Sequence, residues 1–174
     1  MSLIIRLATF ADIPTLSRLG RQTFVETFID GFGIPYSQSD LASFLPAAYG
    51  EEAIAGYQAD PDYQHFIVES DGEAVGYALV GPNGLPHDDA RPEDGELKRI
   101  YLLKSAQGLG AGKALYNASI QWLERNGPSR IWLGVWSGNE KAQAFYAHNG
   151  FAKVGEYQFV VGETLDHEFI MLRA

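Results

Sequence analysis

The sequence predicts a layered α/β protein, in which a mixed, mostly antiparallel sheet carries a central parallel strand pair and has helices on both faces. Stretches with strand-like and helix-like patterns follow one another in the order β-α-α-β-β-β-α-β-α-β-β. Short turn signals join two pairs of neighbouring strands, which predicts antiparallel hairpins. Residues 97–136 read as strand, glycine-rich turn, helix and strand, and such a crossover joins parallel strands.

The N-terminal half predicts a strand, two helical regions and a hairpin. Residues 3–8 form a short strand, and Thr9 or Asp12 can cap the next helix, which has Pro14 in its first turn and an apolar face that continues to Phe28. The following features are, in chain order, an irregular helical region over residues 37–57 broken near Pro46 and Gly50, strands over 65–69 and 74–80 joined by the turn Ser70-Asp71-Gly72-Glu73, and a loop over 81–95.

The C-terminal half contains the crossover and a closing strand pair. The predicted elements are a strand over 97–103, a helix from Ala111 that Gly127-Pro128 stops, a buried strand over 131–136, a helix over 140–148 capped by Asn139, and strands over 152–161 and 165–172.

Composition narrows the class of protein. The 174 residues, 46% of them apolar, predict one globular domain over residues 1–174, and the net charge of −9 argues against nucleic acid and against an anionic membrane as partners. The chain has no cysteine and its four histidines have no metal-binding spacing, so we expect no disulfide, no cysteine nucleophile and no metal. No run approaches 18 apolar residues, and we expect a cytoplasmic location.

Three glycines, Gly108, Gly110 and Gly112, stand between a strand and a helix start. A helix start presents unpaired N–H groups and partial positive charge, and glycines let a phosphate approach that backbone without meeting a Cβ. The turn therefore indicates an anion cradle, with a plain tight turn as the alternative.

Two familiar phosphate loops do not fit this turn. A Walker A loop needs Gly where Gln107 stands and Ser or Thr where Ala114 stands. A dinucleotide fingerprint that begins at Gly108 needs Gly or Ala where Lys113 stands, and it also needs an acidic residue in the next strand, which has none over residues 130–136. A nucleotide-binding module is thereby disfavoured.

The pattern Gln107-x-x-Gly110-x-Gly112 resembles the pyrophosphate loop of the GNAT superfamily of acyl-CoA-dependent N-acyltransferases. A second stretch is similar to another GNAT pattern at matching spacings, formed by Asn139, Ala142, Phe145, Tyr146, Gly150 and Phe151. Because the predicted element order also agrees with a GNAT domain, the resemblance covers nearly the whole chain.

The resemblance implies acetyl transfer from acetyl-CoA to a primary amine. It implies that the pyrophosphate lies on Gln107, Gly108, Leu109, Gly110, Ala111 and Gly112, that Lys113 lends charge, and that Asn139 and Phe145 belong to the same cofactor site. It implies that the pantetheine pairs with the edge of Ile100, Tyr101 and Leu102, where a backbone N–H polarises the carbonyl. Tyr146 would donate a proton to the departing thiolate.

The amine must lose a proton before it attacks, because an alkyl ammonium has a reference pKa near 10.4. Glu96 is the first candidate for the base, Glu26 is the alternative, and a proton-accepting water chain remains open. Without a cysteine there is no cysteinyl intermediate, which favours direct attack in a ternary complex.

A narrower likeness points to the acceptor. Gln22-Thr-Phe-Val-Glu-Thr-Phe28 and Arg99-Ile-Tyr101 resemble bacterial Pai-type spermidine/spermine N-acetyltransferases. Glu26 and Asp30 stand one helical turn apart and are the expected substrate-binding acids for a polyamine. Amino acids, antibiotics and peptide N-termini stay open as alternative acceptors. A CoA-binding regulatory domain without turnover stays open as an alternative function, and a homodimer as the oligomeric state.

Overall fold

The computed structural model describes residues 2–127 and 130–174, whose strands form one seven-stranded sheet in the order β1-β2-β3-β4-β5-β7-β6. The strands are β1 (Leu3–Leu7), β2 (Gln64–Ser70), β3 (Glu73–Pro82), β4 (Gly95–Leu102), β5 (Ile131–Trp136), β6 (Ala152–Val161) and β7 (Thr164–Arg173). Neighbouring strands run antiparallel, apart from the parallel pair β4 and β5. The predicted mixed sheet with a central parallel pair is confirmed.

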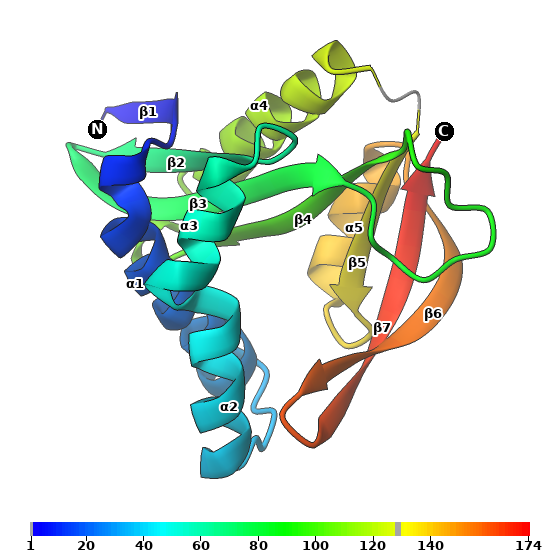
Figure 1. The fold of residues 1–174 in the computed structure, drawn as a ribbon, viewed down its shortest axis with the longest axis horizontal. Helices are drawn as coiled ribbons and strands as arrows, with labels where there is room; N and C mark the ends of the chain where they lie inside the picture. The colour runs from blue at the N-terminus through cyan, green and yellow to red at the C-terminus, as the bar shows by residue number, and fades with distance from the viewer. Residues whose placement is uncertain (1, 128–129) are drawn as a thin grey trace.

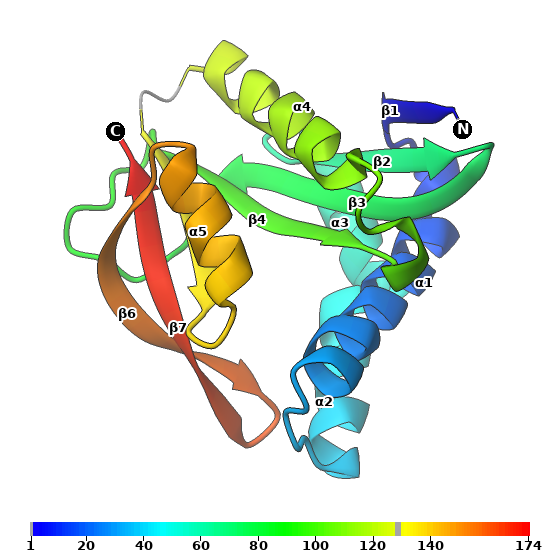
Figure 2. The ribbon, with the colours of Figure 1, turned by 180° about the vertical axis from the view of Figure 1, so that it is seen from behind.

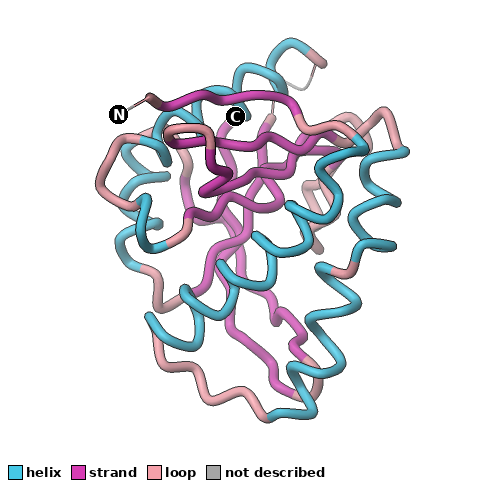
Figure 3. Tube along the Cα trace, turned by 90° about the vertical axis from the view of Figure 1, so that its left-hand side faces the viewer, coloured by secondary structure: helices cyan, strands magenta, loops and turns pink. Residues whose placement is uncertain are grey.

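Helices cover both faces of this sheet, as predicted (Figures 1 and 2). On one face lie α1 (Ile13–Phe24), α2 (Gln38–Tyr49) and α3 (Glu51–Ala59), and on the other lie α4 (Ala111–Arg125) and α5 (Glu140–His148). Figure 3 shows the strands as a layer with helices on either side. Among the described residues, no helix combines the length and apolar character that crossing a membrane requires.

The alternation of side chains along β2 explains why both faces need a cover. Ile67 packs with Leu16 and Leu19 of α1, whereas its neighbour Val68 packs with Leu115 of α4 on the opposite face. All five side chains are fully buried. The strand is therefore apolar on both sides, and each side has its own helix layer.

The helices on the first face differ in part from the predictions. The α-helical part of the first helix ends at Phe24, and a π-helical segment, η2 (Val25–Gly31), follows it directly. The π-helix is rare in proteins overall, but the known cases are often found at functional sites. The break predicted at Gly50 is present, but the one predicted near Pro46 is wrong, because Pro46 lies inside α2 and its carbonyl accepts the N–H of Gly50. The stop predicted at Gly127-Pro128 falls partly outside the described residues, since Pro128 is not among them.

The parallel strands β4 and β5 separate soon after they meet. They are in register only at Gly95 with Ile131 and Glu96 with Trp132. On its other edge β5 pairs along its whole length with β7 (Figure 1). On its other edge β4 stays paired with β3 as far as Leu102. From residue 97 to residue 102, the backbone edge of β4 that faces β5 therefore has no strand partner in the described part of the chain. The site lies in the gap between the two strands.

Asp40 joins the start of α2 to the turn between β6 and β7. Its carboxylate accepts the N–H of Glu163 at 2.7 Å, the hydroxyl of Thr164 at 2.7 Å and the N–H of Ser37 at 3.1 Å. These hydrogen bonds, led by the Glu163 N–H, lower the pKa of Asp40 to about 2.

We expect Asp40→Asn to lower the melting temperature by a few degrees at pH 7. A depressed pKa stabilises the fold above the unfolded-state value, and this contribution is lost as the pH falls through the folded-state value. The difference in melting temperature between Asp40→Asn and wild type should therefore narrow as the pH falls from 4 to 2. Asp62→Asn, at an exposed turn position, is the control; a gap that stays constant over that pH range would contradict the assignment.

Candidate active site

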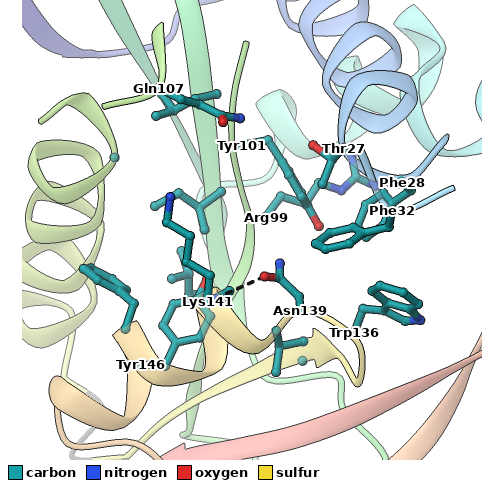
Figure 4. A pocket seen from close by; sticks show the side chains of 18 of the residues that line it. Thr27, Phe28, Phe32, Arg99, Tyr101, Gln107, Trp136, Asn139, Lys141 and Tyr146 are labelled. Atoms are coloured by element: carbon teal, nitrogen blue, oxygen red, sulfur yellow. Dashed lines mark hydrogen bonds between the residues drawn. The ribbon is translucent and has the colours of Figure 1, made fainter. Parts of the chain in front are cut away.

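A cavity of about 480 Å³ fills the gap between β4 and β5 (Figure 4). Its walls come from η2, β4, the glycine turn, the start of α4, β5, α5 and β7. The predicted site residues that line it are Ile100, Tyr101, Leu102, Gln107, Gly108, Gly110, Gly112, Lys113, Asn139, Phe145 and Tyr146. The structure therefore brings the glycine turn and the second sequence pattern to one cavity. Two other predicted cofactor residues do not line it, because Leu109 faces solvent and Ala111 is buried.

The glycine turn presents a row of backbone donors to this cavity. Gly108 and Gly110 both have φ of +81°, in the left-handed region that residues with a Cβ avoid. Within the described chain no hydrogen-bond acceptor is recorded for the N–H groups of residues 108–113, which lead into α4. A Cβ added at either glycine would stand in open space, so the turn leaves room for an anion beside free N–H groups. This geometry fits a pyrophosphate.

Tyr146 lies at the far end of the cavity from Gln107 (Figure 4). Burial, with a smaller contribution from Tyr116, raises the pKa of its phenol well above the ordinary value. The phenol is therefore protonated at neutral pH and can donate a hydrogen bond to a group in the cavity. Phe145 packs edge-on against Tyr116, with ring centroids 5.0 Å apart, which fixes the helix that carries Tyr146.

Asn139 caps α5, as predicted, since its side chain accepts the N–H of Ala142 at 3.1 Å. This bond fixes the start of the helix at the cavity wall. Its role toward a cofactor stays a prediction.

Phe28 of η2 and Phe32, the residue that follows η2, close the opposite wall. Phe32 contacts Trp136 with ring centroids 4.7 Å apart, and Phe28 contacts Tyr101 at 5.9 Å (Figure 4). The sequence analysis missed the lining role of these residues and of Lys141. Phe24, Phe28 and Phe32 recur every four positions, a spacing that reads as core. In the structure Phe28 of the π-helical segment and Phe32 just after it line the cavity.

A second cavity of about 320 Å³ adjoins the first. The residues that line both are Phe28, Lys98, Arg99, Tyr101, Gly134 and Glu168. Its remaining walls are aromatic side chains of α1, α2 and β6, the carboxylates of Glu96 and Asp166, and Tyr36, Ala48, Gly84, Leu85 and Pro86. A ligand in the second cavity therefore meets a ligand in the first one at Glu168 and its neighbours.

Glu96, the first candidate for the base, lines the second cavity but is already engaged. Its carboxylate pairs with Lys98 at 2.6 Å and accepts the N–H of Gly84 at 3.2 Å. The side chain is buried, and a buried pair of this kind is expensive to break. Its role as the base stays a prediction.

The structure places Glu26 and Asp30 apart from both cavities. They line a separate shallow hollow with Arg18 and Arg21. Both carboxylate oxygens of Glu26 are occupied, by the N–H of Lys104 at 2.8 Å and by the amide of Gln22 at 3.0 Å. The prediction that these two acids bind the acceptor gains no support from their position.

Two carboxylates of β7 face the second cavity instead. Asp166 and Glu168 are two positions apart and so point to the same face of the strand. Asp166 accepts a hydrogen bond from Tyr36, and Glu168 accepts one from Tyr157 at 3.0 Å. The sequence carried a signal for them, since two acids spaced by two in a strand share one face.

Residues 23–151 match the model of the Acetyltransferase (GNAT) family. The chain belongs to this family. It is therefore an acetyl-CoA-dependent N-acetyltransferase, which confirms the predicted enzyme class and cosubstrate.

Similar proteins agree with this assignment. The chain is 33% identical over 163 residues to an uncharacterized N-acetyltransferase in the pepI 3′ region of Lactobacillus delbrueckii subsp. lactis, an alignment that covers 94% of this chain and 92% of that protein. It is also 35% identical over 92 residues to a probable spermine N(1)-acetyltransferase of Bacillus subtilis subsp. natto, covering 51% of this chain and 59% of that one. The crystal structure of the PaiA N-acetyltransferase from Thermoplasma acidophilum in complex with coenzyme A superposes with a TM-score of 0.78 at 23% identity, over 99% of each chain, and shows the same fold.

Proposed function

We propose that this N-acetyltransferase transfers the acetyl group directly to a primary amine held in the second cavity. The observation that carries the proposal is the junction of the two cavities at Glu168, Arg99 and Tyr101. Acetyl-CoA in the first cavity and an amine in the second would bring thioester and nitrogen together there. The chain has no cysteine to form an acyl-enzyme, which supports attack in a ternary complex.

The parts of acetyl-CoA are assigned to the first cavity by chemistry. The pyrophosphate would accept the free N–H groups of residues 108–113, with Gln107 and Lys113 beside it. The pantetheine would pair with the open β4 edge at residues 100–102, and a backbone N–H there would polarise the thioester carbonyl. Tyr146 would donate a hydrogen bond to the departing sulfur.

For the acceptor we propose a small primary amine, with a polyamine as the first candidate. The named activity of the Bacillus subtilis subsp. natto relative supports a polyamine, and two carboxylates of β7 face the cavity that would hold it. Aromatic rings along the same cavity, among them Phe44 and Phe159, suit the methylene stretches between the charges and attract cations.

The experiment is the release of free CoA thiol from acetyl-CoA with a panel of polyamines, amino acids, antibiotics and peptide N-termini. We expect turnover with spermidine or spermine. Binding of CoA without turnover on any amine would instead favour a CoA-binding regulatory domain.

If the acceptor is a polyamine, kcat/KM for spermidine should fall steeply with added salt. Attraction between a polycation and a protein of net charge −9 is screened by ions. The rate should drop several-fold between about 20 mM and 300 mM NaCl, whereas the rate with a monoamine of similar length should change little. A salt-insensitive rate, or a preference for monoamines, would discard the polyamine and leave the acetyltransferase in place.

A further inference from the structure

Among the acids that line the second cavity, Glu168 is the one that lies at the junction with the first cavity. It lines both cavities, whereas Glu96 and Asp166 line only the second. An amine that moves from the second cavity toward a thioester in the first crosses the junction that this carboxylate lines. Glu96 is paired with Lys98, whereas among the described residues neither Asp166 nor Glu168 has a cationic partner within 4 Å. Of these two uncompensated acids, only Glu168 lies at the junction.

The space around Glu168 is kept open by the neighbouring strand. Gly134 of β5 lines both cavities, and a Cβ there would lie 2.6 Å from the hydroxyl of Tyr157 and 3.2 Å from a carboxylate oxygen of Glu168. A larger residue would displace the hydrogen-bonded pair. The absence of a side chain at this position therefore lets the pair reach the junction.

We propose that Glu168 receives the acceptor ammonium and takes its proton before the nitrogen attacks the acetyl carbon. This role rests on the proposed function. The proton moves from the ammonium to the carboxylate, and the neutral amine forms the C–N bond as the C–S bond breaks. The nitrogen then loses its second proton, the sulfur gains one, and Glu168 returns its proton to solvent, so that the products are the amide, CoA thiol and one released proton.

The environment of Glu168 prepares it for this exchange. Burial raises the pKa of its carboxyl to about 7; the hydroxyl of Tyr157 opposes the rise, and the charge of Asp166 adds to it. A base with a pKa near the working pH combines a large ionised fraction with useful basicity. The titratable and charged side chains that share its two cavities are Tyr36, Tyr49, Glu96, Lys98, Arg99, Tyr101, Lys113, Lys141, Tyr146, Tyr157 and Asp166.

The test is the pH profile of kcat/KM for wild type and for Glu168→Gln. Wild type should show an acidic limb near pH 7, where Glu168 ionises, and a decline near pH 10, where the amine loses its charge. In Glu168→Gln we expect kcat to fall by about 10²–10⁴-fold. The acidic limb should vanish, and the remaining rate should rise about tenfold per pH unit up to pH 10, because it now follows the fraction of neutral amine.

Two further variants separate a base from a structural residue. Tyr157→Phe removes the hydrogen bond that favours the ionised carboxylate, so the acidic limb should move to a higher pH. Glu163→Gln, in the exposed β6–β7 turn, should leave the profile unchanged. Calorimetry with CoA should give the wild-type affinity for each variant.

Folding of Glu168→Gln has its own readout. The pKa of Glu168 is higher in the folded chain than its unfolded-state value of about 4.5. Ionisation of Glu168 therefore destabilises the fold as the pH rises above about 4.5, and the full loss of stability is reached above pH 7. Glu168→Gln should therefore melt above wild type at pH 8 and close to it at pH 4.

The proposal is overturned if folded Glu168→Gln keeps kcat within threefold of wild type, or if the acidic limb disappears in Glu96→Gln rather than in Glu168→Gln. Either result leaves the acetyltransferase standing. A wild-type protein that binds CoA and releases no thiol with any amine would overturn the proposed function, and the role of Glu168 with it.

Discussion

Tyr146→Phe should lower kcat by about 10²-fold or more while CoA affinity stays nearly unchanged. The phenol faces the first cavity, and its raised pKa keeps it protonated. A raised pKa makes full proton transfer to a thiolate unfavourable, so the main contribution would be a hydrogen bond that strengthens as negative charge develops on sulfur. Removing one oxygen atom deletes this bond and leaves the ring contacts with Tyr116 and Phe151 in place.

Steady-state thiol release and calorimetry with CoA measure the two quantities separately. Tyr63→Phe is the matched control, since Tyr63 lines neither cavity and loses the same hydroxyl. Wild-type turnover in Tyr146→Phe would remove this residue from the mechanism.

Gly110→Asp should weaken CoA binding by about 10²-fold or more. The substitution places a negative charge where a pyrophosphate would lie, and it puts a Cβ on a residue with φ of +81°, which costs roughly 1–2 kcal/mol. Gly110→Asn carries a side chain of the same shape without the charge and tolerates the left-handed conformation better. We expect its loss of affinity to be several-fold smaller.

Gly72→Asp controls for backbone strain and added charge at once. Gly72 has φ of +87° and open space around it, and it lies in the β2–β3 turn. Calorimetry should find wild-type CoA affinity in this variant. Unchanged affinity in folded Gly110→Asp would place the pyrophosphate elsewhere.

Most of the fold could be predicted because its signals are local. The Asp71-Gly72 turn has positive φ at both residues, as a two-residue hairpin turn requires, and the sequence shows this directly. The buried strand over residues 131–136 and the helix over 140–148 were predicted with the bounds that the structure has. Both depend on apolar runs and caps within a few residues.

The errors arose where distant contacts override local preference. Pro46 would end an isolated helix, yet α2 continues through it beside an aromatic cluster that includes Phe24 and Phe44. The first helix changes to a π-helical turn after Phe24, and no periodic pattern in the sequence marks that change. Phe28 of this segment and Phe32 just after it nevertheless line the first cavity.

The sequence by itself determined the family, the glycine turn and the tyrosine of α5, because spacing along one loop or one helix determines how those groups are presented. Only the tertiary structure decided which acids face the second cavity. Glu26 and Asp30 satisfy a helical spacing rule, but both lie on η2 and line another hollow. Glu168 reaches the junction because β7 lies beside β5, where Gly134 leaves room. The order of strands in a sheet depends on contacts between residues far apart in the chain, and no local pattern carries that information.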